Sequence, residues 1–196
     1  SNLLDSIKRQ SIKVNPKDIY IVVESKKDKT VEIAKTHNIN IVYRKDLTKR
    51  RKGYAIDDAI KKIIKAKKYY DMYFIFDADN ILDRNFFKEM IKSYKKGYDI
   101  GIGYRNTKNG NSSIYAAASS LTFSMINTFS NNYKVKHNLT LTVSGTGFYI
   151  KGEVLEKLGG YPFNSLTEDY ELSLYAVLND LTSTYNTKAK YFDEQP

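Results

Sequence analysis

Two aspartates one residue apart, Asp77 and Asp79, directly follow an apolar and aromatic segment at residues 72–76. Such a segment is typical of a buried strand. In open α/β sheets, ligands bind beyond the carboxyl ends of the strands, so both carboxylates are predicted to lie where a ligand binds. Side chains alternate along an extended chain, which would put Asp77 and Asp79 on one face. Together they can hold a divalent cation, and the cation can hold a diphosphate.

The acidic pair could instead have a purely structural role, because a short acidic segment after a strand also forms turns or caps helices. A calcium loop of the EF-hand type is a poorer match, because its sixth position would be Leu82 where Gly is needed and its twelfth Lys88 where Glu is needed. A dinucleotide-binding loop is not indicated either, because Gly101 and Gly103 lack the third glycine of that motif.

Small residues at Gly145, Thr146 and Gly147 precede another apolar segment. A tight turn with close backbone packing would account for them. A binding floor would account for them equally well, because small side chains let a sugar approach the backbone. The residues by themselves favour neither role.

A pair of acids, Glu168 and Asp169, begins a predicted helix. Negative charge at a helix N-terminus is favourable in itself, and Ser165 with Glu168 has the spacing of a capping box. The alternative role is that of a general base, because a hydroxyl nucleophile needs a base within hydrogen-bond reach as it attacks. A carboxylate in the first turn, close to a metal-bound diphosphate, could take that role.

The 196 residues, of which 41% are hydrophobic, predict one domain with a substantial core. No apolar run approaches the length of a membrane-spanning helix. The absence of cysteine excludes disulfides and cysteine-based zinc sites. The formal net charge of +10 favours anionic partners, namely nucleic acid, phosphorylated substrates or the inner face of a membrane. The basic run at residues 49–52, in a predicted loop, is the best candidate for a phosphate contact.

Strands and helices alternate along the chain, which indicates one α/β domain with a largely parallel first half. Asp28 and Asp83 are predicted to cap helices. Residues 113–129 are predicted to form a well-buried helix, because alanine and apolar residues lie nearly all round it. The predicted strands lie at residues 18–23, 39–43, 72–76, 98–103, 146–150 and 191–192.

The order of these segments resembles that of the inverting family 2 glycosyltransferases of GT-A fold, especially the processive, membrane-linked group of cellulose, chitin and hyaluronan synthases. The resemblance covers almost the whole chain, and Tyr104-Arg105-Asn106 also resembles a recurrent segment of this group. It implies a Rossmann-like nucleotide-diphospho-sugar transferase fold, in a single domain with a mixed central sheet. The segments that carry it are Glu24, Lys52-Gly53, Asp77-Ala78-Asp79, Gly145-Thr146-Gly147-Phe148 and Thr167-Glu168-Asp169.

The resemblance also implies a role for each segment. Asp79, helped by Asp77, would bind Mg²⁺ or Mn²⁺, and Asp169 would be the catalytic base. The remaining candidates would bind the substrates: Glu24, Lys52, Gly145, Thr146, Gly147 and Glu168.

Three departures from the family pattern qualify the resemblance. Glu24 stands where the family usually has Asp, and Arg51 replaces the first glycine of a Gly-Lys-Gly step. The family's opening strand and its C-terminal Gln-x-x-Arg-Trp motif are both absent. Residues 1–196 are therefore expected to be a partial catalytic domain.

The expected function is metal-dependent transfer of a sugar, with inversion, from a UDP-sugar to the hydroxyl group of a saccharide or lipid-linked acceptor. The expected setting is synthesis of cell-surface polysaccharide or glycan, with this soluble domain on the cytoplasmic face of a membrane-anchored longer protein and without a nucleic-acid partner. One alternative is a sugar nucleotidyltransferase, although that class needs a glycine-rich phosphate loop that is not visible here. Another is a non-catalytic, basic nucleic-acid-binding domain, which would explain the charge but not the spaced carboxylates.

Overall fold

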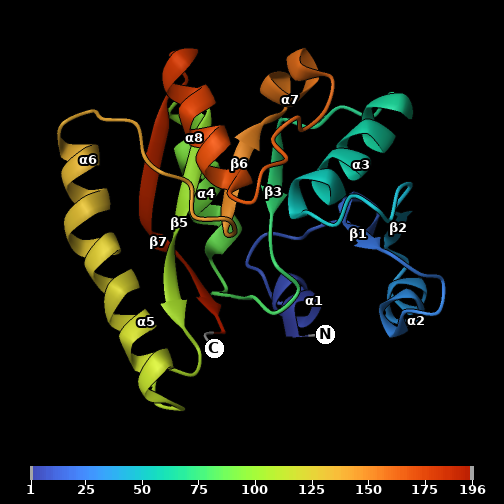
Figure 1. Ribbon diagram of the computed structural model, residues 1–196, viewed down its shortest axis with the longest axis horizontal. Helices are drawn as coiled ribbons and strands as arrows, with labels where there is room; N and C mark the ends of the chain where they lie inside the picture. Colours follow the sequence, from blue (N-terminus) through green and yellow to red (C-terminus); the bar gives the residue numbers. More distant parts are fainter. Residues whose placement is uncertain (1, 195–196) are drawn as a thin grey trace.

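The computed structural model describes residues 2–194, which fold into a mixed β-sheet with helices on both faces (Figure 1). Two parallel strands form a small sheet at one side, β1 (Tyr20–Val23) and β2 (Asn40–Tyr43). The larger sheet has five strands in the order β3-β6-β5-β7-β4. Its strands are β3 (Met72–Ile75), β4 (Ile81–Leu82), β5 (Ile100–Thr107), β6 (Phe148–Lys151) and β7 (Ser183–Asp193).

The larger sheet mixes both strand directions, as the resemblance implied. β6 is antiparallel to β3 and to β5, β7 is parallel to β5, and the short β4 is antiparallel to β7. The final strand is much longer than the predicted residues 191–192. The alternation of polar and apolar side chains that would mark β7 is not evident in the sequence. The reasons are that the pairing register of β7 with β5 shifts between Gly103 and Tyr104 and that residues 186–190 are mostly polar.

The helices on the two faces are α1 (Asn2–Lys8), α2 (Lys29–Thr36), α3 (Lys52–Lys65), α4 (Phe86–Lys95), α7 (Gly152–Leu158) and α8 (Glu168–Leu178). Each strand alternates its side chains between two apolar layers. In β6, Phe148 and Ile150 join the core cluster shared with α3, α7 and α8. The intervening Tyr149 joins the cluster shared with α1, α2 and α4. The strand ends that carry the candidate residues are thus fixed between two cores.

The predicted helix caps have mixed outcomes. Asp28 caps α2 as predicted, because its carboxylate accepts a 2.8 Å hydrogen bond from the Thr30 N–H. The prediction for Asp83 is wrong, because α4 begins after Asn85. Asp83 instead accepts from the Asn85 N–H at 2.9 Å, which makes it part of the preceding turn. The helix α7, the strand β4 and the short 3₁₀ helix η1 (Pro16–Asp18) were not predicted.

A long helix stands beside β7, at the left of Figure 1, and consists of α5 (Ile114–Met125), the π-helical η2 (Ile126–Asn131) and α6 (Asn132–Lys136). The prediction that residues 113–129 are well buried is wrong, because Ile114 is 87% exposed and Phe129 is 69% exposed. The apolar composition suggested burial, but the helix packs along one narrow stripe. Within residues 2–194, no helix combines the length and apolar composition that a membrane crossing requires.

The small and the large sheet meet without backbone pairing. Within the described residues, β1 pairs with β2 alone and β3 pairs with β6 alone. Side chains join them instead. The hydroxyl oxygens of Tyr20 on β1 and Tyr70, just before β3, lie 3.3 Å apart, and their rings meet edge to face at 6.4 Å. Ile21 and Phe74 pack in the same apolar cluster.

Candidate active site

The Asp-Ala-Asp segment forms a tight turn beyond the end of β3. The Asn80 N–H donates to the Asp77 carbonyl oxygen at 3.1 Å, which closes the turn. The prediction of an extended segment is therefore wrong here. The Asp77 N–H donates hydrogen bonds to two acceptors, Asn80 Oδ1 at 3.1 Å and Thr146 Oγ1 at 2.9 Å. Asp77 is half-buried and Asp79 is exposed, so both carboxylates remain accessible to solvent.

Lys52, the first residue of α3, joins two of the candidate segments. Its Nζ lies 2.5 Å from Asp77 Oδ1 and donates to the Gly145 carbonyl oxygen at 2.7 Å. The following Gly53 lets α3 approach this closely, because a Cβ there would lie 1.9 Å from the carbonyl oxygen of Phe163. The structure therefore places Lys52 beside Asp77 and Gly145, and its role in binding a substrate stays a prediction.

The small residues at 145–147 form a sharp bend directly before β6. The bend contacts both the Asp77 turn and β7. Gly145 and Gly147 have φ angles of +74° and +68°, which favour glycine. The Gly147 N–H donates to the Ile75 carbonyl oxygen at 2.9 Å, and Tyr191 Oη donates to the Thr146 carbonyl oxygen at 3.0 Å. The interpretation of this segment as a tight turn is thus correct. A binding role stays open, because Gly145 also borders the acids of α8.

Asp169 and Glu168 occupy the first turn of α8, close to this bend. A Cβ built on Gly145 would lie 3.5 Å from Asp169 Oδ2, so the Asp169 carboxylate faces the glycine directly. Glu168 is buried, with 7% exposure. Burial raises the pKa of its carboxyl above the ordinary value of 4.5; the positive charge of Lys52 opposes the shift, and the negative charges of Asp169 and Asp77 add to it.

The predicted capping box before α8 is wrong. Thr167 precedes the helix and makes no side-chain capping bond. Ser165 Oγ accepts from the Thr167 N–H at 3.2 Å, and the Ser165 N–H donates to Glu171 Oε2 at 3.1 Å. Glu168 therefore does not form the predicted capping box; its carboxylate accepts a hydrogen bond from its own backbone N–H, and Lys52, Asp169 and Asp77 lie close enough to act on its charge.

Glu24 is the one predicted site residue that the structure leaves apart. It is exposed, directly after β1. Among residues 2–194, no hydrogen bond or ion pair joins its carboxylate to Lys52, Asp77 or Asp169. Its contact with a nucleoside stays a prediction.

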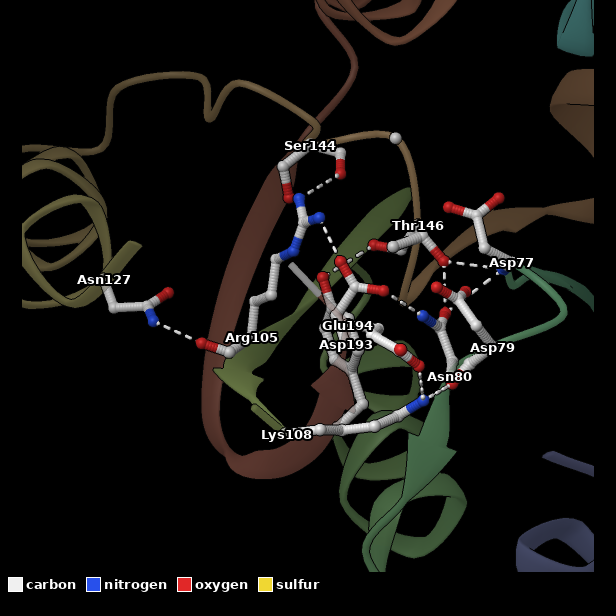
Figure 2. Close-up of polar contacts among 12 residues, drawn as sticks. Asp77, Asp79, Asn80, Arg105, Lys108, Asn127, Ser144, Thr146, Asp193 and Glu194 are labelled. Carbon is white, nitrogen blue, oxygen red and sulfur yellow. Dashed lines mark hydrogen bonds and ion pairs between the residues drawn. The ribbon is translucent and has the colours of Figure 1, made fainter. Parts of the chain in front are cut away.

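A buried polar network lies directly behind the Asp77 turn and was not predicted (Figure 2). Thr146 Oγ1 donates to Asn80 Oδ1 at 2.5 Å, and Asn80 Nδ2 donates to Asp193 Oδ1 at 2.7 Å. Asp193 Oδ2 accepts from Arg105 Nη2. The network ties the turn to the ends of β5 and β7. Asn80 could have been noticed because it adjoins the acidic pair, but nothing local marks Asp193, 113 positions further on.

Lys108 is a second basic residue that the sequence analysis missed. Its Nζ donates to the Asp79 carbonyl oxygen and lies 3.7 Å from Glu194 Oε2 (Figure 2). Its backbone N–H donates to the Asp193 carbonyl oxygen at 2.8 Å. A cation thus lies on each side of the acidic pair, Lys52 beside Asp77 and Lys108 beside Asp79. Such a pair of cations suits an anionic ligand.

The donor set fits a metal ion that is shared with a substrate. Among residues 2–194, no group of three or more His, Cys, Asp or Glu side chains is arranged to hold a metal. Asp77 and Asp79 offer two carboxylates, and Mg²⁺ is commonly held by one or two carboxylates with substrate phosphates and water as the other ligands. The site suits such a cation better than a resident structural ion.

Comparison with solved structures supports the fold. A mannosyltransferase from Pyrobaculum calidifontis, in complex with GDP-Man and Mn²⁺, aligns with a TM-score of 0.66 and 16% identity, over 97% of this chain and 51% of that chain. Glucosyl-3-phosphoglycerate synthase from Mycobacterium tuberculosis, in complex with Mn²⁺, UDP-glucose and phosphoglyceric acid, aligns with a TM-score of 0.53 and 15% identity, over 85% of this chain and 57% of that chain. The chain therefore spans little more than half the length of these proteins.

The sequence itself matches a protein family. No curated protein sequence matches the chain. The family described as "Glycosyltransferase like family 2", however, matches residues 1–194. The chain therefore belongs to this glycosyltransferase family and has the GT-A fold of the solved transferases that it resembles.

Proposed function

We propose that residues 1–196 form part of the catalytic domain of an inverting, metal-dependent glycosyltransferase that moves a sugar from a UDP-sugar to a hydroxyl acceptor. One observation carries the proposal: segments far apart in the sequence meet at the end of β3. Lys52 contacts Asp77 and the Gly145 carbonyl oxygen, and Gly145 borders Asp169. A candidate metal ligand, a cation and a candidate base thus share one site.

Asp169 is proposed as the base because its carboxylate is only half-buried and faces the open backbone at Gly145. As the acceptor hydroxyl oxygen forms its bond to the anomeric carbon, the bond from that carbon to the diphosphate breaks on the opposite side. The hydroxyl proton passes to Asp169, and UDP leaves with the bonding electrons. A single displacement of this kind inverts the configuration.

The other residues are proposed to bind and orient the donor. Asp79 and Asp77 would hold Mg²⁺ or Mn²⁺, which when bound offsets the charge that develops on the departing diphosphate. Lys52 would contact a phosphate, and Glu24 would contact the nucleoside. The residues proposed to shape the floor of the acceptor site are Gly145, Thr146, Gly147 and Glu168.

Several observations favour this reaction over its alternatives. The family match supports glycosyl transfer rather than nucleotidyl transfer or nucleic-acid binding. The two solved relatives were obtained with GDP-Man and with UDP-glucose, which supports a nucleotide-sugar donor. The choice of uridine follows from the resemblance to the cellulose and hyaluronan synthase group. By that resemblance, the proposal includes a membrane-anchored longer protein, this domain on its cytoplasmic side, a saccharide or lipid-linked acceptor, and a role in polysaccharide or glycan synthesis.

The test measures nucleoside diphosphate release by the longer protein that contains this domain, with Mn²⁺, across UDP-sugars and GDP-Man. The Asp169→Asn variant should lose about two to four powers of ten in rate and keep its UDP affinity. Glu153→Gln, which changes an exposed acid at the start of α7, is the matched control and should keep the parental rate. Parental turnover by Asp169→Asn would mean that Asp169 is only a helix N-terminal charge. Turnover with GDP-Man but no UDP-sugar would contradict the uridine assignment.

A further inference from the structure

The long helix formed by α5, η2 and α6 has an inverted distribution of polarity. Its protein-facing side is largely polar: Asn127 is buried and donates from Nδ2 to the Arg105 carbonyl oxygen at 2.8 Å, and Lys134 donates to Thr142 Oγ1 at 2.9 Å. On the same side, the Arg105 guanidinium carbon lies 3.9 Å from the centroid of the Phe123 ring. A surface helix of a globular protein normally directs its apolar side chains inward.

The solvent-facing side of this helix carries the large apolar residues. Leu121 and Phe129 are 64% and 69% exposed. Within α5, at 100° per residue, Ile114, Leu121 and Met125 fall on the face opposite Phe123. Contiguous exposed apolar patches on a soluble protein mark contact sites for other molecules. The exposed apolar residues of the helix are Ile114, Tyr115, Leu121, Met125, Ile126, Phe129, Tyr133 and Val135.

The segment of chain that contains this apolar face carries charges of one sign. The sequence from Ile100 to Gly152 contains no Asp or Glu, whereas it contains Lys108, Lys134 and Lys136 among its basic residues. Of the two lysines in the last turn of α6, Lys136 is exposed, whereas Lys134 faces the protein. An apolar face with basic residues and no acids suits a surface that is apolar below and anionic at its polar boundary.

We propose that the exposed face of α5, η2 and α6 lies on an anionic lipid bilayer, with its apolar side chains in the boundary between headgroups and acyl chains. Amphipathic helices with basic residues bind in this position by burying apolar area and by attraction to anionic lipids. The helix lies on the bilayer and does not cross it. This docking surface is independent of sugar transfer and of any anchor elsewhere in a longer protein.

A second copy of the chain is the less favoured occupant. Each copy carries a formal net charge of +10, and the span that holds the helix has no acid to pair with the lysines of its partner. Self-association through this face would bring like charges together, whereas an anionic bilayer offers the opposite charge.

Vesicle flotation of the purified chain tests the proposal, with phosphatidylcholine vesicles that contain about one-third phosphatidylglycerol and with phosphatidylcholine alone. The chain should float with the anionic vesicles and much less with the neutral ones. The double variant Leu121→Ser/Phe129→Ser should bind the anionic vesicles at least about tenfold more weakly. The matched control is Leu47→Ser/Tyr69→Ser, which removes two similarly exposed apolar side chains outside the helix and should bind like the parent. Circular dichroism confirms that each variant is folded.

A fluorescence measurement reads out the position of the face directly. The chain contains no tryptophan, so Phe129→Trp and Tyr69→Trp each introduce a single reporter. Anionic vesicles should shift the emission of Phe129→Trp to shorter wavelength and leave that of Tyr69→Trp unchanged. The proposal is overturned if the parent chain does not bind anionic vesicles, or if both double variants bind equally. It is also overturned if the chain is a dimer that only Leu121→Ser/Phe129→Ser dissociates, because a second copy would then cover the face.

Discussion

Lys52 and Asp77 form an ion pair with 2.5 Å between Nζ and Oδ1, although the two residues belong to different layers of the molecule. Lys52 begins α3, and Asp77 lies in the turn beyond β3. Lys52 thus contacts one of the two carboxylates that are proposed to bind the metal ion. When a cation with its diphosphate binds Asp77, we expect Lys52 to exchange that carboxylate for a phosphate oxygen. The Lys52 side chain would then exchange one negatively charged partner for another.

Removal of the positive charge of Lys52 should weaken nucleotide binding. We expect Lys52→Met to bind UDP about 10- to 100-fold more weakly in Mn²⁺, because a hydrogen bond to a charged group contributes about 1.5–3 kcal/mol. Isothermal titration calorimetry measures the affinity. Lys61→Met, which changes another lysine of α3 that pairs with Asp57, is the control and should bind like the parent. Equal affinities for parent and Lys52→Met would place the phosphate elsewhere.

Metal dependence should appear in the melting temperature. We expect UDP at about one hundred times its Kd to raise the Tm by about 5–10 °C in Mn²⁺ and by much less in EDTA, because the diphosphate needs a cation between it and Asp79. Asp79→Ala should abolish the difference, and Asp71→Ala, an exposed acid at the opposite end of β3, should retain it. A shift of the same size with and without metal would remove the proposed role of the acidic turn.

The buried acid Glu168 should make stability depend on pH. Its pKa is raised in the folded state, so the folded protein binds more protons than the unfolded chain just above pH 4.5, and stability falls as pH rises through that window. We therefore expect Glu168→Gln to raise the Tm at pH 7, with the gain shrinking as pH falls toward 4.5. The measurement is thermal unfolding between pH 4 and 8, with Glu153→Gln as the exposed control. A Tm below that of the parent at pH 7 would mean that Lys52 stabilises the Glu168 carboxylate more than burial destabilises it.

The bend at residues 145–147 should tolerate no side chain at its second glycine. A Cβ on Gly147 would lie 2.2 Å from Tyr191 Cε1, whereas one on Gly159 would meet no atom within 4 Å, and the two glycines have similar φ angles of +68° and +64°. Both alanine variants introduce the same backbone strain, so their difference isolates the steric conflict. We expect Gly147→Ala to lose about 1–3 kcal/mol more than Gly159→Ala in urea unfolding. Equal losses would show that Tyr191 moves aside freely.

The sequence predicted those parts of the site that depend on local patterns. Asp77 and Asp79 follow an apolar strand, and Glu168 and Asp169 open a helix, so both acidic pairs could be assigned to element ends. Their convergence with Lys52 was expected only through the family resemblance, because spacing along a chain does not determine contacts across it.

The parts that were missed depend on long-range contacts. Arg105 and Asp193 meet only because β5 and β7 are parallel neighbours, and the register shift between these strands hides the pattern of β7. The helix predicted at residues 113–129 was expected to be buried because of its composition. Its apolar composition is evident in the sequence, but only the fold determines which face has a protein partner. Composition therefore predicted burial that the fold does not provide.

The lack of backbone pairing between β1 and β3 leaves the molecule in two units, residues 20–65 and the five-stranded sheet, that are held together by side chains. Among residues 2–194, no backbone hydrogen bond joins the two units, although Ile60 and Ile63 of α3 pack in the core of the larger sheet, so we expect the first unit to open more readily than the sheet. We expect the amide hydrogens of β1 and β2 to exchange with solvent before those of β5 and β6. Lys52 belongs to the first unit and Asp77 to the second. A ligand that bridges these two residues would therefore slow exchange in β1 and β2, at amides that it does not touch.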